Sequence, residues 1–154
     1  MAAQRMRKIV LAVTTVAVLV AGVVSAFAFS LGKYEKFKVN GDAAAIALDK
    51  VSDGKAHFFK LNDGGREIAF FAVKAADGSF KVAFDACDAC FKSKKGYEQQ
   101  GDRMNCKNCN QKFAIAKLGS NATGGCNPGY LPSQVNGGNL LIKISDIKSG
   151  ARYF

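Results

Sequence analysis

Two Cys-x-x-Cys pairs constrain this chain more than any other feature of its sequence. Cys87 and Cys90 form the first pair, Cys106 and Cys109 form the second, and fifteen residues lie between the pairs. Two residues between paired cysteines let both sulfurs turn toward one point from a tight loop, and a separation of about 15–20 residues lets a second such loop meet the first across a hairpin. The spacing predicts four thiolates around one metal ion or cluster, and it leaves the metal open.

The cysteine pairs have three other uses that the spacing alone leaves open. A closed site for a single zinc or iron ion would make the protein a binding module without redox activity. Two structural disulfides are a second use in an oxidising compartment, and a catalytic dithiol is the third, although that motif normally opens a helix after a strand. Heme attachment is excluded, because Phe91 and Asn110 follow the pairs where a histidine is required.

The residues that most enzyme sites need are scarce here. The chain has one histidine, His57, and no tryptophan, so a Ser/His/Asp triad would depend on that single imidazole. His57 lies in the apolar run Ala56-His57-Phe58-Phe59, which indicates a partly exposed strand position. No glycine-rich phosphate loop occurs. We therefore expect an electron-transfer or metal-binding protein rather than an enzyme.

Residues 1–32 have the pattern of an export segment. Arg5, Arg7 and Lys8 precede an uncharged and mostly apolar run from residue 9 to residue 29. This run serves either as a signal peptide cleaved after Ala26-Phe27-Ala28 or as a retained hydrophobic helix that anchors the protein in a membrane. Since the positive end stays inside, both versions predict that the remaining domain lies outside the cytoplasm.

Residues 33–154 predict one all-β domain. Short apolar runs alternate with Gly, Asp and Asn turns at intervals of about ten residues, which is typical of antiparallel sheets. The expected strands are 44–48, 56–61, 67–74, 80–85, 112–116 and 139–145. The chain carries a net charge of +10, which can steer an acidic redox partner or attract an anionic lipid surface, or can simply keep the protein soluble. The lysines are spread rather than interleaved with aromatic residues, so nucleic acid is not an expected partner.

The order of these parts resembles the Rieske domain over residues 43–146. The similar pieces are a short β lead-in, a glycine-rich turn, a strand that ends near the first ligand loop, the second ligand loop, and a late strand, at residues 51–55, 65–69, 83–87, 106–113 and 131–142. The resemblance implies an antiparallel β-sandwich with two metal-binding loops. One departure matters: cysteine stands at every position where the Rieske pattern alternates cysteine with histidine.

A second resemblance is to the FtrD-like family of membrane iron–sulfur proteins. The segments that carry it are Ala83-Phe84-Asp85-Ala86-Cys87-Asp88-Ala89-Cys90, Gly96-Tyr97, Gly101-Asp102, the pair Cys106 and Cys109, and Gly124-Gly125-Cys126-Asn127-Pro128. This resemblance implies an exported or membrane-anchored iron–sulfur protein in the bacterial periplasm or on the outer face of the cytoplasmic membrane. Because the family occurs beside bacterial iron-uptake systems, it also implies iron-transport membrane proteins or a redox protein as partners.

The Rieske-like layout implies an all-cysteine [2Fe–2S] centre. Cys87 and Cys106 would bind one iron, and Cys90 and Cys109 the other. Two thiolates in place of two imidazoles add negative charge, so the potential should fall from roughly −150 to +300 mV toward about −400 mV. General secretion threads an unfolded chain, which would require assembly of a cluster outside the cytoplasm. A single zinc or mononuclear iron site avoids that requirement.

Cys126 is a fifth thiol, which leaves one cysteine without a partner in any full pairing. Its loop lies where the Rieske family places a proline-containing loop that covers the cluster. We therefore expect Cys126 to cap the site, either as an alternative ligand or as a thiol that exchanges with one. A buried loop cysteine with no such role is the other interpretation.

Overall fold

The computed structural model describes residues 32–154, and residues 34–154 form one compact unit. The predicted signal peptide or anchor of residues 1–32 falls almost entirely outside the described residues. No helix between residues 32 and 154 is long and apolar enough to span a bilayer.

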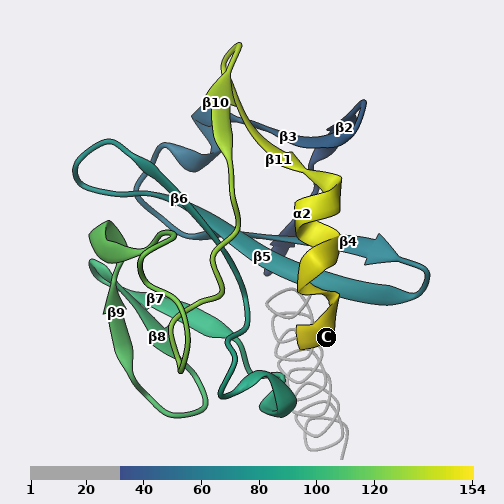
Figure 1. Cartoon of the computed structure of the whole chain (residues 1–154). Coiled ribbons are helices and arrows are strands. Elements are labelled where there is room, and N and C mark those ends of the chain that lie inside the picture. The colour runs from purple at the N-terminus through teal and green to yellow at the C-terminus, as the bar shows by residue number, and fades with distance from the viewer. Residues whose placement is uncertain (1–31) are drawn as a thin grey trace, which may run out of the picture. The chain divides into compact units, whose positions relative to one another are not determined.

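Three sheets make up most of this unit (Figure 1). The first has the strand order β1 (Tyr34–Glu35), β4 (His57–Asp63), β5 (Arg66–Lys74), β6 (Phe80–Phe84). The second has the order β10 (Gln134–Asn136), β11 (Asn139–Lys143), β3 (Ala43–Ala47), β2 (Lys38–Asn40). The third has the order β7 (Tyr97–Gln100), β8 (Arg103–Cys106), β9 (Lys112–Ala114).

Strand β5 divides the interior into two cores because successive strand residues point to opposite faces of a sheet. Ile68 and Phe70 pack on one face with residues of the second sheet such as Ile46 and Leu140. On the other face, Phe71 and Val73 pack with a cluster of side chains that includes Tyr97, Met104, Cys87 and Cys106. Two of the five cysteines are thus part of a hydrophobic core, which fixes where they lie.

Short helices complete the unit. Three-residue and four-residue 3-10 helices lie at η1 (Leu48–Val51), η2 (Phe91–Ser93), η3 (Ile115–Lys117) and η4 (Gly150–Tyr153). The helix α2 (Ile144–Ser149) follows β11 directly and runs into η4. Tyr153 of η4 packs its ring against Phe84 and Phe91, with centroids 5.6 and 6.1 Å away. The last turn of the described chain therefore braces the end of β6 and the start of η2.

The all-β expectation holds in coarse form, and two details differ. Each of the six expected strands overlaps an observed one, namely β3, β4, β5, β6, β9 and β11. The fold is mostly β, but it has three sheets and the helix α2 rather than a pure sandwich. The pairing of β1 with β4 is parallel, with Tyr34 opposite Phe58, whereas every other strand pair is antiparallel among residues 32–154. The parallel pair arises because β1 reaches β4 through the intervening second-sheet strands rather than through a hairpin.

Candidate metal centre

The first cysteine loop begins where β6 ends and is anchored by Asp85. The backbone N–H of Asp85 donates to the carbonyl of Ala69 on β5 at 2.9 Å. Asp85 is only 5% exposed, and its carboxyl group accepts hydrogen bonds from the backbone N–H of Tyr97 at 2.6 Å and from the Tyr34 hydroxyl at 3.4 Å. The residue two positions before Cys87 thus ties the loop to β5, to β7 and to β1.

The turn within the first pair has the geometry that a Cys-x-x-Cys metal loop needs. The backbone N–H of Cys90 points at the sulfur of Cys87, 3.3 Å away, and the N–H of Phe91 donates to the Cys87 carbonyl at 3.1 Å. Hydrogen bonds from backbone N–H groups stabilise a thiolate over a thiol. The loop therefore aims a backbone donor at the Cys87 sulfur, as in loops that hold a metal-bound thiolate.

The second cysteine loop joins β8 to β9. The N–H of Cys106 donates to the Gln111 carbonyl at 2.9 Å, and the N–H of Asn110 donates back to the Cys106 carbonyl at 2.8 Å. Asn110 has a φ of +59°, in the left-handed region where asparagine is enriched. The N–H of Lys107 donates to the Gly96 carbonyl at 3.0 Å. This hydrogen bond connects the second cysteine loop to the segment that follows the first cysteine loop.

Cys126 reaches the site on a third loop. The Tyr97 hydroxyl donates to the Cys126 carbonyl at 2.5 Å, and the N–H of Ala89, inside the first pair, donates to the Gly125 carbonyl at 3.0 Å. The N–H of Gly129 likewise donates to the Ala86 carbonyl at 3.0 Å. Residues 125–129 are therefore bonded along the backbone of the first cysteine loop.

The five thiols form two overlapping groups. The sulfurs of Cys87, Cys90 and Cys126 lie within 4.8 Å of one another, and so do those of Cys90, Cys106 and Cys109. Cys90 belongs to both groups, and its sulfur is 3.6 Å from that of Cys126. The structure thus brings together all five cysteines singled out in the sequence. Which four of them bind a metal, and how they divide between two irons, stays a prediction.

Burial is graded across the thiols. Cys87 and Cys106 are each 1% exposed, Cys90 and Cys126 are half-buried, and Cys109 is exposed. One side of the cluster is therefore sealed by the core, and the other opens to solvent at Cys109.

The thiols perturb each other's acidity in different directions. The side-chain amide of Asn108 and the neighbouring sulfur of Cys126 lower the pKa of Cys90 to about 7. Burial raises the pKa of Cys106 to about 11. Hydrogen bonding with Cys109, together with burial, raises the pKa of Cys126. Cys90, the thiol shared by both groups, is the one that ionises most readily among these three, and a thiolate is the form that binds metal. Asn108 has no signal in the sequence other than its place between the second pair of cysteines.

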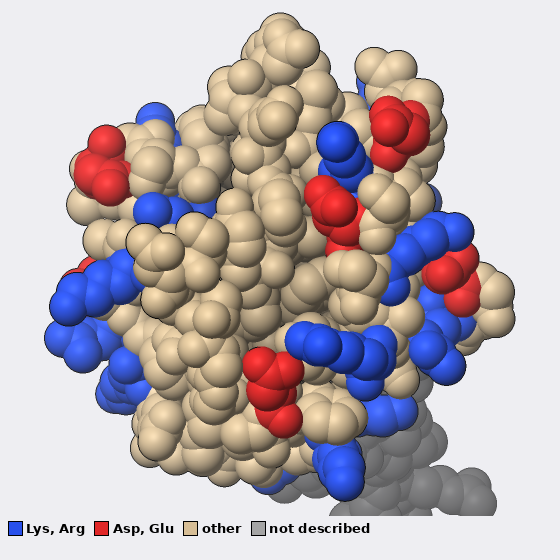
Figure 2. All heavy atoms as spheres, in the orientation of Figure 1, with Lys and Arg blue, Asp and Glu red and all other residues tan. Residues whose placement is uncertain are grey.

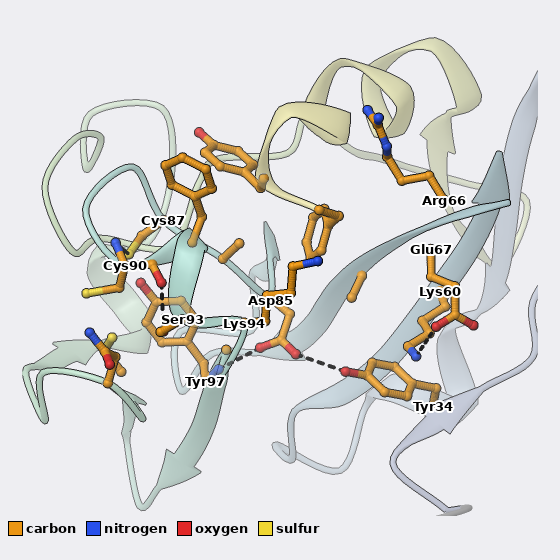
Figure 3. A pocket seen from close by; sticks show the side chains of 18 of the residues that line it. Tyr34, Lys60, Arg66, Glu67, Asp85, Cys87, Cys90, Ser93, Lys94 and Tyr97 are labelled. Carbon is orange, nitrogen blue, oxygen red and sulfur yellow. Dashed lines mark hydrogen bonds and ion pairs between the residues drawn. The ribbon is translucent and has the colours of Figure 1, made fainter. Parts of the chain in front are cut away.

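A cleft of about 610 Å³ adjoins the thiols (Figure 3). Cys87 and Cys90 lie at one end, and Arg66 and Glu67 of β5 lie at the other; Cys106 also lines the cleft. Between them, Figure 3 shows Asp85 with dashed hydrogen bonds to Tyr97 on one side and Tyr34 on the other. Burial, with a smaller effect from the neighbouring sulfur of Cys87, raises the pKa of Tyr97, so this phenol stays protonated as a hydrogen-bond donor.

His57 takes part in a different arrangement. Its Nδ1 is 2.5 Å from Glu35 of β1, and its Nε2 is 2.9 Å from Asp53. Burial alone lowers the pKa of His57, but the hydrogen bonds to Asp53 and Glu35 outweigh it, so the pKa is raised overall. The half-buried strand position expected from the sequence is observed, and the two carboxylates explain why a histidine is placed there.

The donor set fits the chemistry of iron–sulfur ligation, since such clusters are held by cysteine thiolates and five thiols converge here. The family model described as "Membrane iron-sulfur containing protein FtrD-like" matches residues 51–154, which include all five cysteines. The chain belongs to this family. Membership of the FtrD-like family confirms the resemblance in the sequence and associates the protein with a membrane and with iron–sulfur chemistry. No curated protein matches the chain.

Proposed function

We propose that this FtrD-like protein is a one-electron carrier, with an iron–sulfur centre bound by Cys87, Cys90, Cys106 and Cys109 and with [2Fe–2S] as the favoured type. The observation that supports it is the convergence of five thiols within two groups that share Cys90, in a chain of a membrane iron–sulfur family. When bound, such a centre supplies reversible transfer of single electrons.

The residues around the thiols suit this role because they hold their positions without needing to move. Cys87 and Cys106 are packed in the same core as Phe71 and Met104. Loops fixed on a rigid β scaffold reorganise little, and little reorganisation is what fast electron transfer requires. The exposed side at Cys109 leaves one edge open for a redox partner.

The associated process that we propose is iron uptake on the outer side of a bacterial membrane. Iron changes its oxidation state during import, and each change moves one electron per iron ion. A membrane-associated carrier next to an iron-transport protein supplies or removes that electron. The protein is then a component of a transport system rather than an enzyme in its own right.

A closed site for one zinc or iron ion is the second candidate, and one distance between sulfurs suits a single tetrahedral ion as well as it suits one iron of a cluster. Metal–sulfur bonds of about 2.3 Å give a tetrahedron whose edges are about 3.8 Å. The sulfurs of Cys90 and Cys126 are 3.6 Å apart, close to one such edge. In this version the protein binds or hands on metal without exchanging electrons.

Analysis of the full-length chain, purified without oxygen, separates the two candidates. An iron–sulfur protein contains iron and acid-labile sulfide, absorbs visible light, and gives a paramagnetic signal when reduced. A colourless protein with one zinc ion per chain would contradict the electron-transfer proposal. Cys126→Ser and Cys109→Ser form a matched pair for the ligand set: we expect loss of cluster only in Cys109→Ser. An unchanged metal content and spectrum in Cys109→Ser would refute the proposed set of four.

A further inference from the structure

Five lysines lie in or beside the two cysteine loops, and we call them the lysine collar. Their positions are in η2 and the residues after it, in the second cysteine loop and at the start of β9: Lys92, Lys94, Lys95, Lys107 and Lys112. All five are exposed. In Figure 1 the segments that carry them lie at the opposite end of the unit from β2, β3 and β11. The collar is thus a local feature of one end.

No carboxylate among residues 32–154 forms an ion pair with the collar. The nearby acidic groups are engaged elsewhere. Asp88 accepts hydrogen bonds from Arg152 and from the Tyr153 hydroxyl, at 3.3 and 3.0 Å. Glu98 accepts from the side-chain amides of Gln100 and Asn105, and residues 1–31 contain no Asp or Glu at all. None of the five collar lysines is therefore neutralised by a direct ion pair within residues 32–154.

The collar belongs to the same loops as the exposed thiol of the cluster. Cys109, the exposed thiol, lies between Lys107 and Lys112 in the sequence. Figure 2 shows Lys and Arg scattered over the face drawn, with Asp and Glu groups among them. A patch of one sign accelerates encounter with a partner of the opposite sign and orients it. Here the orientation would bring that partner onto the edge at Cys109.

We propose that the lysine collar is the docking surface for an acidic electron-carrier protein. That the partner carries electrons rests on the proposed function, whereas the docking itself depends only on the collar. An acidic protein can carry a redox group to Cys109, whereas a layer of lipid headgroups would cover the collar without presenting one. In the docked complex one electron leaves one protein and enters the other, and no bond is made or broken.

Two triple variants of the full-length chain test the collar at equal net charge. Lys92, Lys95 and Lys107 are changed to Gln in the first; Lys94 is left alone because its φ of +53° lies in the left-handed region. The control changes Lys38, Lys50 and Lys143, which are also exposed and lie on the second sheet and η1. Each variant removes three positive charges. The probe is a purified acidic flavodoxin, and the readout is its dissociation constant by calorimetry.

We expect the collar variant to weaken flavodoxin binding about tenfold and the control to change it less than about twofold. Binding to the unmodified chain should also weaken between 0.01 and 0.15 M salt, where the screening length falls from about 30 to about 8 Å. Equal losses in the two variants would overturn the proposal, because net charge alone would then explain them.

A parallel measurement uses vesicles of phosphatidylglycerol and phosphatidylcholine. If the collar variant releases the vesicles but keeps its affinity for flavodoxin, the surface faces lipid and the proposal is wrong. Stopped-flow mixing with reduced flavodoxin distinguishes failure of the docking surface from failure of the proposed electron-transfer function. Collar-dependent binding with no electron transfer supports the docking surface while contradicting the proposed function, and unaltered binding in the collar variant contradicts the docking surface whatever the electron-transfer rate.

Discussion

Gly96 is the position where a single methyl group should separate backbone strain from damage to the thiol site. Gly96 has a φ of +65°, and a Cβ added there would overlap the Asp85 carboxyl group, with its Oδ2 only 2.7 Å away. That carboxyl group accepts the hydrogen bond from the Tyr97 N–H. Gly96→Ala should therefore push Asp85 out of its place two residues before Cys87. Gly101 is a matched control, with a φ of +61° and nothing within 4 Å of an added Cβ.

The magnitude follows from two separate contributions. An alanine in the left-handed region costs about 1–2 kcal/mol, and this cost is common to both variants. Only Gly96→Ala also breaks a buried hydrogen bond, and leaving the Tyr97 N–H unsatisfied costs about 1–3 kcal/mol. We therefore expect Gly96→Ala to lower the free energy of unfolding by about 2 kcal/mol more than Gly101→Ala does.

Urea denaturation of both variants, followed by near-ultraviolet circular dichroism of the tyrosines, measures this difference. Metal content should fall in Gly96→Ala and stay normal in Gly101→Ala, because only the first displaces a cysteine loop. If the two variants lose the same stability and bind the same metal, Asp85 does not position the first cysteine loop and the reasoning is refuted.

Three further perturbations have defined outcomes. Because its carboxylate partners raise the pKa of His57, its contribution to stability is present below the unfolded value of about 6.5 and is lost as the pH rises through the folded value. Between pH 6 and pH 8 the unmodified protein should lose more unfolding free energy than His57→Gln, and equal losses would contradict this. Tyr153→Phe removes the hydrogen bond to Asp88. The free energy of local opening of the first cysteine loop should fall by about 1 kcal/mol, so its amides should exchange faster. Unchanged exchange would show that Tyr153 does not brace this loop. An added Cβ at Gly150 would lie 2.7 Å from Cδ1 of Phe84, so Gly150→Ala should cost about 1–3 kcal/mol in thermal denaturation, and a neutral result would show that Phe84 moves aside freely.

The sequence correctly predicted the strands that are rich in apolar residues. Residues 67–74 are almost continuously apolar because β5 is covered on both faces, and such runs are hard to mistake. The spacing of the cysteine pairs predicted their convergence for a related reason, since the hairpin of β7 and β8 lies between the two loops and folds them together.

Other parts had weaker signals. The strand β7 reads Tyr97-Glu98-Gln99-Gln100, whose polar side chains gave no expectation of a strand, and its pairing with β8 supplies the stability instead. The expected strand 139–145 ends at Lys143, where the six-residue helix α2 begins without any side-chain cap. The contact of Cys90 with Cys126 joins residues 36 positions apart, and local sequence patterns carry no information about such a distance beyond the family resemblance.

The graded burial of the five thiols has a consequence for how the holoprotein matures. A chain that folds before it meets its metal would already have Cys87 and Cys106 sealed in the interior, while Cys109 would still face the surrounding fluid. Metal would then reach the thiols only from the side of Cys109, and the Cys109 sulfur would be the last to bind it. The same direction is the one from which peroxide would arrive, so oxidative ageing of the protein should begin at Cys109.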